Sequence, residues 1–393
     1  MSYNYNSKIF SKIKTLLKNF REFYHQKKGV DVSKIKKIED IPFLKREDFN
    51  DISQFLRSGK EYFVTMTSGS TTNSFFILRN KKSFDAHIKR QVKIYKTAGL
   101  SKKDRFLNLL SYSISGAARI IDEALGKIGV CRIPVGSIKT RQHLHFVIKV
   151  IQDLHPTVIE GYVNEIYEVF SRIGKKHSIK KCIVTGEYLS NDFKEIICKI
   201  GGVEIFNNYG SMEFSGFAIS DDPEDEYMRL FEDGLYIEIL KDDGSVSELG
   251  KGKIVITDLE NFCMPFIRYI LGDIVEIIKR GEKKYIRVLG RTDDSILLDG
   301  EVFSKQEIIE TIQGILKHPH FFLLINKNPY TYKDKVLINL SPSDKDKIEK
   351  IKKAISERLR ILDIFEFNIY KGSVPKTSTG KFRHIIDLRK NVR

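Results

Sequence analysis

Two hydroxyl-rich segments carry the side chains best suited to phosphate chemistry. The first spans residues 65–72 and contains six Ser or Thr residues and one glycine, directly after the apolar residues 62–64. Hydroxyl groups and successive backbone N–H groups donate hydrogen bonds, and Gly69 lets the main chain approach an anion closely. Residues 65–72 are therefore a candidate phosphate-binding loop, with an ordinary polar turn as the alternative.

The second segment spans residues 374–381 and ends in Lys381. An ammonium group held where negative charge concentrates stabilises a transition state, since the loss of one preorganised donor commonly costs about 2.7–4 kcal/mol. A lysine near the end of a basic chain is usually a solvated surface charge. Here its setting, Pro-Lys-Thr-Ser-Thr-Gly at 375–380, favours a role in binding or catalysis.

Length and composition indicate a globular protein with two domains. A single core tends to stop growing near about 250–300 residues, and this chain has 393. It is 41% hydrophobic and 30% charged, and no run of about 18 apolar residues exists that could span a membrane. Residues 1–6 lack the basic start and apolar core of a secretory signal, so we expect a cytoplasmic protein.

The net charge of +16 is compatible with nucleic acid, with anionic cofactors or with acidic protein partners, and does not distinguish them. The sequence lacks zinc-ligand spacing, an RNP-like aromatic strand and a basic recognition helix, which disfavours nucleic acid. The cysteines are too widely spaced for a disulfide framework or a CxxC metal site, and we expect buried thiols at Cys131, Cys182, Cys198 and Cys263.

The apolar pattern predicts an α/β fold with a mostly parallel sheet. Residues 1–60 form a helical segment that packs on the large domain, since apolar residues recur at helical spacing from Ile9 to Phe20 and a short helix follows residues 41–44. Short apolar runs then alternate with helical patterns up to residue 210, as in a parallel sheet covered by helices. The expected strands are 106–110, 128–135, 157–160, 181–185 and 203–206, with helices at 143–154 and 164–173.

Two further units follow. Paired strands predict an antiparallel β subdomain at about 231–290, which completes a large domain of residues 61–291. Residues 292–393 predict a small α+β domain, with helices at 306–316 and 348–362 and strands at 321–325, 336–340 and 365–369. Ligands bind beyond the carboxyl ends of strands in such sheets, so the loops after the strands are the places to look for a site.

Five separated segments, taken in order, resemble the adenylate-forming superfamily of acyl-CoA synthetases, luciferases and adenylation domains, in particular its phenylacetate–CoA ligase branch. The resemblance covers roughly residues 60–390. It implies that the loop at 67–72 binds the β- and γ-phosphates of ATP, although the lysine that is common after this loop is absent here. The residues concerned are Thr67, Ser68, Gly69, Ser70, Thr71 and Thr72.

Two loops directly after predicted strands resemble those that enclose adenine in the family. Tyr209 would stack on the base, and aromatic stacking on a base contributes roughly 1–3 kcal/mol in nucleic-acid complexes. Glu213 resembles the carboxylate that binds Mg²⁺, a hard oxygen ligand that suits this ion. Met212 departs from the family, which has a hydroxyl residue there, and Ser211 is a possible substitute. The expected adenine-binding residues are Gly186, Glu187, Asn208, Tyr209, Gly210 and Ser211.

The resemblance also assigns the ribose site and a hinge. Asp273 would accept hydrogen bonds from both ribose hydroxyls, which an ionised carboxylate does well, and Arg291 would lie near the ribose and phosphates. Asp293 would be the hinge about which the C-terminal lid turns between two half-reactions, and Lys381 would reach from that lid to the α-phosphate and the acyl carboxylate. Tyr112, Gly161 and Tyr162 are candidates for the acyl pocket, with the aromatic residues as core side chains in the alternative.

The expected activity is therefore that of an acid–thiol ligase. ATP and Mg²⁺ would activate a small carboxylic acid, such as an aryl acid, as an acyl-adenylate with release of pyrophosphate. The acyl group would then pass to coenzyme A or to the phosphopantetheine of an acidic acyl carrier protein, with release of AMP. The alternatives are transfer to an amine or protein acceptor, and a nucleotide-binding relative weakened by Met212 and by the missing loop lysine.

Overall fold

The computed structural model describes residues 2–67, 75–114, 116–298, 300–328, 331, 333–359, 364–377 and 380–389. Contacts divide it into two compact units, residues 1–136 with 206–292 and residues 137–205 with 293–393. The second boundary falls between Thr292 and Asp293, next to the predicted hinge. Residues 137–205, which the sequence assigned to the large domain, group by contacts with the C-terminal residues. The domain boundaries given above stay a prediction.

The first unit begins with two helices, α1 (Ser2–Asn19) and α2 (Arg21–Lys28). The predicted helical spacing is confirmed, because Ile9, Ile13 and Leu16 share one hydrophobic core with the antiparallel strands of the same unit. The short helix expected after residue 44 is instead a pair of 3₁₀ turns, at Arg46–Phe49 and Ser53–Phe55.

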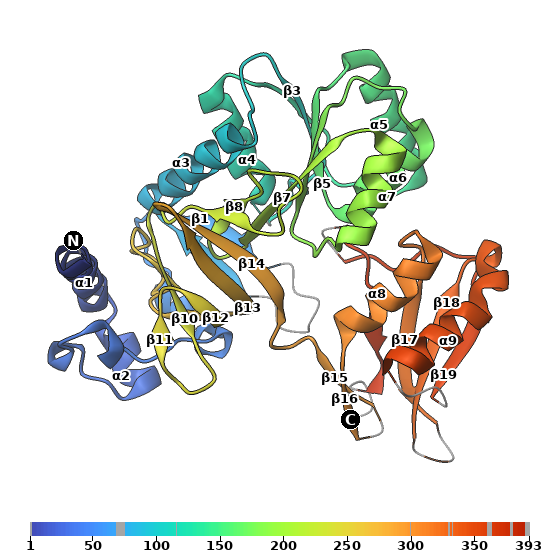
Figure 1. Cartoon of the computed structure of the whole chain (residues 1–393). Coiled ribbons are helices and arrows are strands. Elements are labelled where there is room, and N and C mark those ends of the chain that lie inside the picture. The colour runs from blue at the N-terminus through green and yellow to red at the C-terminus, as the bar shows by residue number, and fades with distance from the viewer. Residues whose placement is uncertain are drawn as a thin grey trace. The chain divides into compact units, whose positions relative to one another are not determined.

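The first unit contains a set of antiparallel strands (Figure 1). Its strand order is β11-β10-β12-β13-β14-β9-β8-β7, so antiparallel pairing begins at β7 and β8, before the predicted start near 231. The strands are β7 (Glu204–Ser211), β8 (Ser215–Ile219), β9 (Met228–Leu230), β10 (Leu235–Leu240), β11 (Val246–Ser247), β12 (Gly250–Asp258), β13 (Tyr269–Arg280) and β14 (Lys283–Arg291).

Smaller elements complete the first unit. A hairpin of β1 (Phe63–Met66) and β2 (Phe76–Arg79) precedes α3 (Lys81–Thr97), which packs on β8 through a hydrogen bond from Arg90 Nε to the Gly216 carbonyl (2.9 Å). The parallel pair β3 (Arg105–Asn108) and β4 (Cys131–Pro134) is joined by α4 (Ala117–Ile128). These two strands were predicted.

The second unit contains the parallel pair β5 (Val158–Gly161) and β6 (Lys181–Thr185) with three helices. These are α5 (Arg141–Leu154), α6 (Val163–Ile173) and α7 (Asn191–Gly201), and the first two begin within two residues of the predicted positions. The strand β5 is buried at every residue, including the carboxylate residue Glu160, so its sequence does not alternate between a buried and an exposed face.

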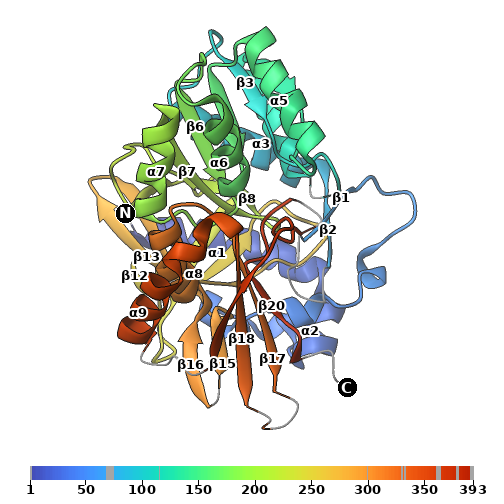
Figure 2. The ribbon, with the colours of Figure 1, turned by 90° about the vertical axis from the view of Figure 1, so that its right-hand side faces the viewer.

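The C-terminal residues of the second unit form the predicted α+β arrangement. A four-stranded sheet of order β19-β18-β17-β20 carries α8 and α9 on one face (Figures 1 and 2). Its elements are α8 (Lys305–Leu316), β17 (Phe322–Lys327), β18 (Asp334–Leu340), α9 (Ile348–Leu359), β19 (Phe365–Ile369) and β20 (Ile385–Asp387). The hairpin β15 (Ser295–Leu298) and β16 (Glu301–Ser304) and the strand β20 were not predicted.

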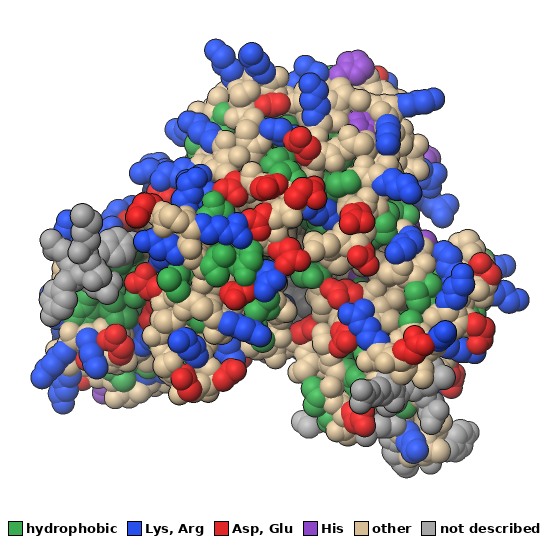
Figure 3. Space-filling view, in the orientation of Figure 1, with side chains coloured by type: hydrophobic (Ala, Val, Ile, Leu, Met, Phe, Trp, Pro, Cys, Tyr) green, Lys and Arg blue, Asp and Glu red, His purple; other side chains and the backbone are tan. Residues whose placement is uncertain are grey.

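Basic and acidic side chains are mixed on one face of the protein (Figure 3), and the four thiols differ in burial. On the face shown in Figure 3, Lys and Arg side chains are spread over many elements and interspersed with Asp and Glu. Cys182 is buried as expected, but the prediction is wrong for Cys131, which is exposed at the start of β4, and Cys198 and Cys263 are half-buried.

Among the described residues, no helix is long and apolar enough to cross a membrane. The cytoplasmic location stays a prediction.

Candidate active site

Predicted adenine and ribose residues of the first unit come together on three strands, β7, β13 and β14. Tyr209 of β7 donates its hydroxyl proton to Asp273 of β13, with 2.6 Å between the oxygens. The other carboxylate oxygen of Asp273 accepts a hydrogen bond from Arg291 Nη1 at 2.6 Å. The Tyr209 ring also packs edge-on against Phe217, with 4.7 Å between ring centroids. Three residues predicted from separate segments therefore form one connected group.

The electrostatics of this group keep Tyr209 protonated. Burial and the neighbouring Asp273 carboxylate raise the pKa of Tyr209 well above its usual value, against the lowering effect of Arg291. The phenol is therefore a fixed donor to a carboxylate that is itself 9% exposed. Asn208 of β7 is buried, and Gly210 and Ser211 continue the strand, where a Cβ on Gly210 would collide with the carbonyl oxygen of Ser215.

Glu213 is buried and lies beside two residues that the sequence did not single out. Its Oε1 accepts a hydrogen bond from the hydroxyl of Tyr269 at 3.3 Å. The fully buried Arg79 donates to the backbone carbonyls of Met212 and Glu213 and to Thr65 Oγ1 at 2.6 Å. Burial lowers the pKa of Arg79 to about 10, against the raising effects of Asp258 and Glu213.

Arg79 therefore connects the strand after the predicted phosphate loop to the Glu213 segment. The sequence indicates Arg79 only by its position, because it is a basic residue directly after the apolar residues 75–78. A fully buried guanidinium is rare unless it is paired and hydrogen-bonded, which marks Arg79 as a residue with a specific role.

Of the six residues 67–72 that the resemblance assigns to phosphate binding, one lies within the described part of the chain. Thr67 is buried, and its hydroxyl accepts hydrogen bonds from Arg46 Nη2 and from the Phe75 N–H, each at 3.1 Å. Ser68, Gly69, Ser70, Thr71 and Thr72 lie outside the described residues.

The second unit brings Lys381 onto the other predicted adenine loop. Lys381 Nζ donates to the carbonyl of Gly186 and lies 5.1 Å from the centroid of the Tyr162 ring. Gly186 has φ 76°, a left-handed conformation that glycine adopts without strain. The Glu187 carboxylate accepts a hydrogen bond from the Val163 N–H at 2.9 Å, at the beginning of α6.

The positive charge of Lys381 affects the pKa of Glu187 in this loop. Burial raises the pKa of Glu187, and the ammonium of Lys381 together with the N–H groups of Val163 and Asn164 opposes that rise. Sequence segments around 162, 186 and 381 thus meet at one place within the second unit. Gly161 ends β5 next to Tyr162 and is buried.

Two further predicted residues have simpler environments. Tyr112 is 44% exposed, and its hydroxyl donates to Asp122 at 2.7 Å and accepts from Asn108 Nδ2 at 3.1 Å. The backbone carbonyl of Asp293 accepts a hydrogen bond from Lys305 Nζ at 2.7 Å. The acyl-pocket and hinge roles of these residues stay predictions.

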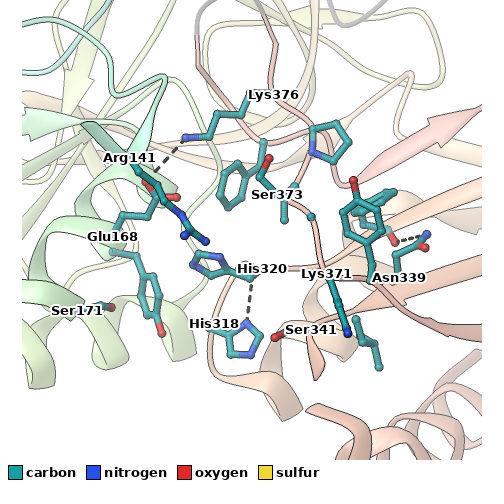
Figure 4. A pocket seen from close by; sticks show the side chains of 18 of the residues that line it. Arg141, Glu168, Ser171, His318, His320, Asn339, Ser341, Lys371, Ser373 and Lys376 are labelled. Atoms are coloured by element: carbon teal, nitrogen blue, oxygen red, sulfur yellow. Dashed lines mark hydrogen bonds and ion pairs between the residues drawn. The ribbon is translucent and has the colours of Figure 1, made fainter. Parts of the chain in front are cut away.

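A cavity of about 840 Å³ lies beside the Lys381 segment in the second unit (Figure 4). Lys376 and Phe382, which flank Lys381 in sequence, form part of its wall. Among the described residues, five Lys or Arg side chains and two histidines line the cavity, against the single carboxylate of Glu168. The cavity is therefore suited to an anionic group.

The fold has a close counterpart among solved structures. A 2-hydroxyisobutyryl-CoA ligase, solved in the postadenylation state with 2-HIB-AMP, matches with a TM-score of 0.79 at 16% identity, over 98% of this chain and 90% of that chain. The fold is thus that of an adenylate-forming enzyme, as the sequence predicted.

Sequence comparison indicates the same class. The chain is similar to a phenylacetate–coenzyme A ligase from Thermus thermophilus, with 23% identity over 409 residues, 92% of this chain and 90% of the relative. It is also similar to an indoleacetate–lysine synthetase from Pseudomonas savastanoi, with 25% identity over 349 residues, 83% of this chain and 84% of the relative. No family model matches. The resemblance to the adenylate-forming superfamily and its phenylacetate–CoA ligase branch is confirmed.

Proposed function

We propose that this chain is an AMP-forming acid–thiol ligase. It would join a small carboxylic acid to ATP as an acyl-adenylate and then transfer the acyl group to a thiol. The observation that carries the proposal is the position of Lys381, whose ammonium meets Tyr162 and the carbonyl of Gly186 within one unit. The relatives named as CoA ligases support the same reaction.

In this mechanism the carboxylate of the acid attacks the α-phosphorus of ATP, and pyrophosphate leaves. Lys381 would hold the two anions together and offset the charge that develops on the phosphoryl oxygens. Tyr209 would contact the base, and Asp273 would accept hydrogen bonds from the ribose hydroxyls in exchange for its present donors, Tyr209 and Arg291. Positioning and electrostatics thus supply the catalysis.

Glu213 fits the role of a magnesium ligand. Mg²⁺ usually takes one or two carboxylates and completes its shell with water and substrate phosphates. Glu213 supplies one buried carboxylate, and no group of three or more potential ligands exists within the described ranges. When bound with ATP, Mg²⁺ would neutralise phosphate charge, while Tyr269 orients the Glu213 carboxylate through its hydroxyl.

The thiol acceptor is coenzyme A in this proposal, with the phosphopantetheine of an acidic carrier protein as the second candidate. Both are polyanionic, and the basic cavity beside Lys376 and Phe382 supports an acceptor of this charge. Because one relative is an indoleacetate–lysine synthetase, the experiment also has to test an amine as the acyl acceptor.

The test combines ATP, Mg²⁺, a panel of aryl and small aliphatic acids, and coenzyme A, a carrier protein or lysine. Acid-dependent ATP–pyrophosphate exchange measures the first step, and AMP release with the product mass identifies the acceptor. We expect Lys381→Ala to lower exchange by about 100-fold or more, the factor seen when one preorganised donor is removed. Lys350→Ala, an exposed lysine on α9, is the matched control and should leave exchange unchanged.

Two outcomes would contradict the proposal. ATP binding without exchange for any acid would indicate the weakened nucleotide-binding relative that Met212 suggests. An amide of lysine, formed in place of a thioester, would assign the chain to amine ligation.

A further inference from the structure

The first turn of α6 carries two buried polar side chains that the proposed reaction does not use. Asn164 is 2% exposed and Glu165 is fully buried. They directly follow Tyr162 and Val163, which contact Lys381 and Glu187. Buried polar groups are retained only where they make hydrogen bonds, so the partners of these two side chains indicate their role.

Asn164 binds the residue next to Lys381. Its Nδ2 donates to the backbone carbonyl of Gly380 at 3.3 Å, across 216 residues of sequence. Gly380 has φ 104°, and a Cβ at this position would lie 2.0 Å from Ser137 Oγ and 3.2 Å from Glu165 Oε1. The backbone of Gly380 is therefore pressed against a polar surface made by Asn164, Glu165 and Ser137.

Glu165 fixes the other side of that surface. Its Oε1 accepts hydrogen bonds from the Ser137 hydroxyl at 2.5 Å and from the Ile138 N–H at 2.6 Å. The carbonyl of Ile138 in turn accepts a hydrogen bond from Lys376 Nζ at 3.1 Å, and Lys376 also pairs with Glu168 at 3.8 Å (Figure 4). Lys376 and Gly380 are thus both anchored, five residues and one residue before Lys381.

We propose that Asn164 and Glu165 are positioning residues that hold Lys381 in place for adenylation. Asn164 does so directly, through Gly380, and Glu165 does so through Ser137 and Ile138. This inference rests on the proposed ligase function. A reacting group misplaced by about 1 Å can lose about 100-fold in rate, so two anchors in the segment that leads to a lysine carried by a lid have a clear physical use.

The same contacts have to break when the lid turns for the second half-reaction. The anchors therefore act in the first step and not in the second. This gives a readout that a purely structural role would not produce, because adenylation and thioester formation should respond differently to one substitution.

The test uses Asn164→Leu in the full-length protein, with an acid that supports exchange in the wild type. We expect acid-dependent pyrophosphate exchange to fall about tenfold, the factor that corresponds to 1.36 kcal/mol. Thioester formation from a chemically prepared acyl-adenylate should stay within about twofold of wild type. Glu165→Leu should behave like Asn164→Leu, whereas Glu165→Gln retains an acceptor oxygen and should restore most of the exchange rate.

Thr311→Val is the matched control, because Thr311 is a buried helical residue of the same unit whose hydroxyl bonds within α8 to the Glu307 carbonyl (2.7 Å). It should lower thermal stability about as much as Asn164→Leu and leave exchange unchanged. Unchanged exchange in Asn164→Leu would overturn the proposal. A parallel loss of both half-reactions with a greater loss of melting temperature than the control would overturn it too.

A second readout does not depend on the proposed function. Trypsin cleaves after Lys376 and Lys381, and we expect both sites to be cut several-fold faster in Asn164→Leu and Ser137→Ala than in Thr311→Val. If no acid supports exchange in the wild type, the ligase assignment fails while faster cleavage still supports the anchors. Equal cleavage rates in all variants would contradict the anchoring itself.

Discussion

The ammonium nitrogen of Lys381 lies 5.1 Å from the centroid of the Tyr162 ring, and the two residues are more than 200 positions apart in sequence. A cation over an aromatic face gains about 0.5–1 kcal/mol at exposed sites and about 2 kcal/mol or more when desolvated. The ring face of Tyr162 therefore orients the lysine.

We predict that Tyr162→Leu lowers the rate of ATP–pyrophosphate exchange about fivefold, which corresponds to roughly 1 kcal/mol. Tyr162→Phe keeps the ring and should stay within about twofold of wild type. The measurement is the exchange rate at saturating ATP for each variant. A Phe variant as slow as the Leu variant would show that the hydroxyl carries the effect.

The pair of Tyr209 and Asp273 should affect ATP binding more than the chemical step. Asp273→Ala removes the acceptor that we propose for both ribose hydroxyls, and hydrogen bonds to charged groups contribute about 1.5–3 kcal/mol each. We expect the KM for ATP to rise at least about tenfold, while Tyr209→Phe, which keeps the ring that we propose stacks on adenine, raises it less than about threefold. Initial rates at varied ATP, with titration calorimetry, check this.

The control for this prediction is Tyr227→Phe. Tyr227 donates its hydroxyl to Glu276 at 2.7 Å, the same phenol–carboxylate contact at a place away from the predicted nucleotide residues. Its KM for ATP should equal that of the wild type. A Tyr209→Phe variant with a larger effect than Asp273→Ala would contradict the assigned roles.

The elements that the sequence predicted best are those with a strong local period. The helices α5 and α6 have buried residues three and four positions apart, and the strands β5 and β6 have short apolar stretches at residues 158–159 and 182–184. The strand β20 has only three residues, and its pairing with β17 joins Ile385 to Leu323, so no local pattern identifies it.

The residues of the candidate site also differ in how well the sequence predicts them. Tyr209, Asp273 and Arg291 were predicted because each lies in a short motif, and the structure brings them together. Arg79 and Asn164 were missed, since their roles depend on contacts to Glu213 and Gly380 across 134 and 216 residues. A buried hydrogen bond between distant segments leaves no periodic signal in either of them.

A buried ion pair supports the segment that precedes Asp273. Arg268 and Glu238 are almost fully buried and lie 3.1 Å apart, and Arg268 Nη1 also donates to the Ile41 carbonyl at 2.9 Å. Removal of one partner from a buried pair costs about 3–5 kcal/mol, because the other charge stays buried without compensation. We therefore predict that Glu238→Ala lowers the free energy of unfolding by about 3–5 kcal/mol, measured by urea denaturation.

Glu276→Ala is the comparison for this ion pair. Glu276 pairs with Arg287 at 2.8 Å, but both side chains are about one-third exposed. Exposed pairs contribute about 0–1 kcal/mol, so this variant should lose less than about 1 kcal/mol. Equal losses for the two variants would show that burial does not determine the contribution of the Arg268 pair.

Glu165 should make stability depend on pH in the neutral range. Burial raises the pKa of Glu165 to about 8, against the lowering effects of the Ser137 hydroxyl and the Ile138 N–H, and the nearby Glu187 carboxylate raises it further. Between about pH 4.5 and 8 the folded protein therefore holds a proton that the unfolded chain releases. The free energy of unfolding falls as pH rises through this window, and the contribution of Glu165 ends above about pH 8.

We predict that Glu165→Gln flattens this dependence. The difference in slope between wild type and variant should approach about 1.4 kcal/mol per pH unit within the window. The comparison between wild type and variant isolates the effect, because the histidines contribute equally to both slopes in the folded and unfolded states. Urea denaturation at four pH values checks the slope. Identical slopes would mean that Glu165 is ionised when buried, held by its two donors.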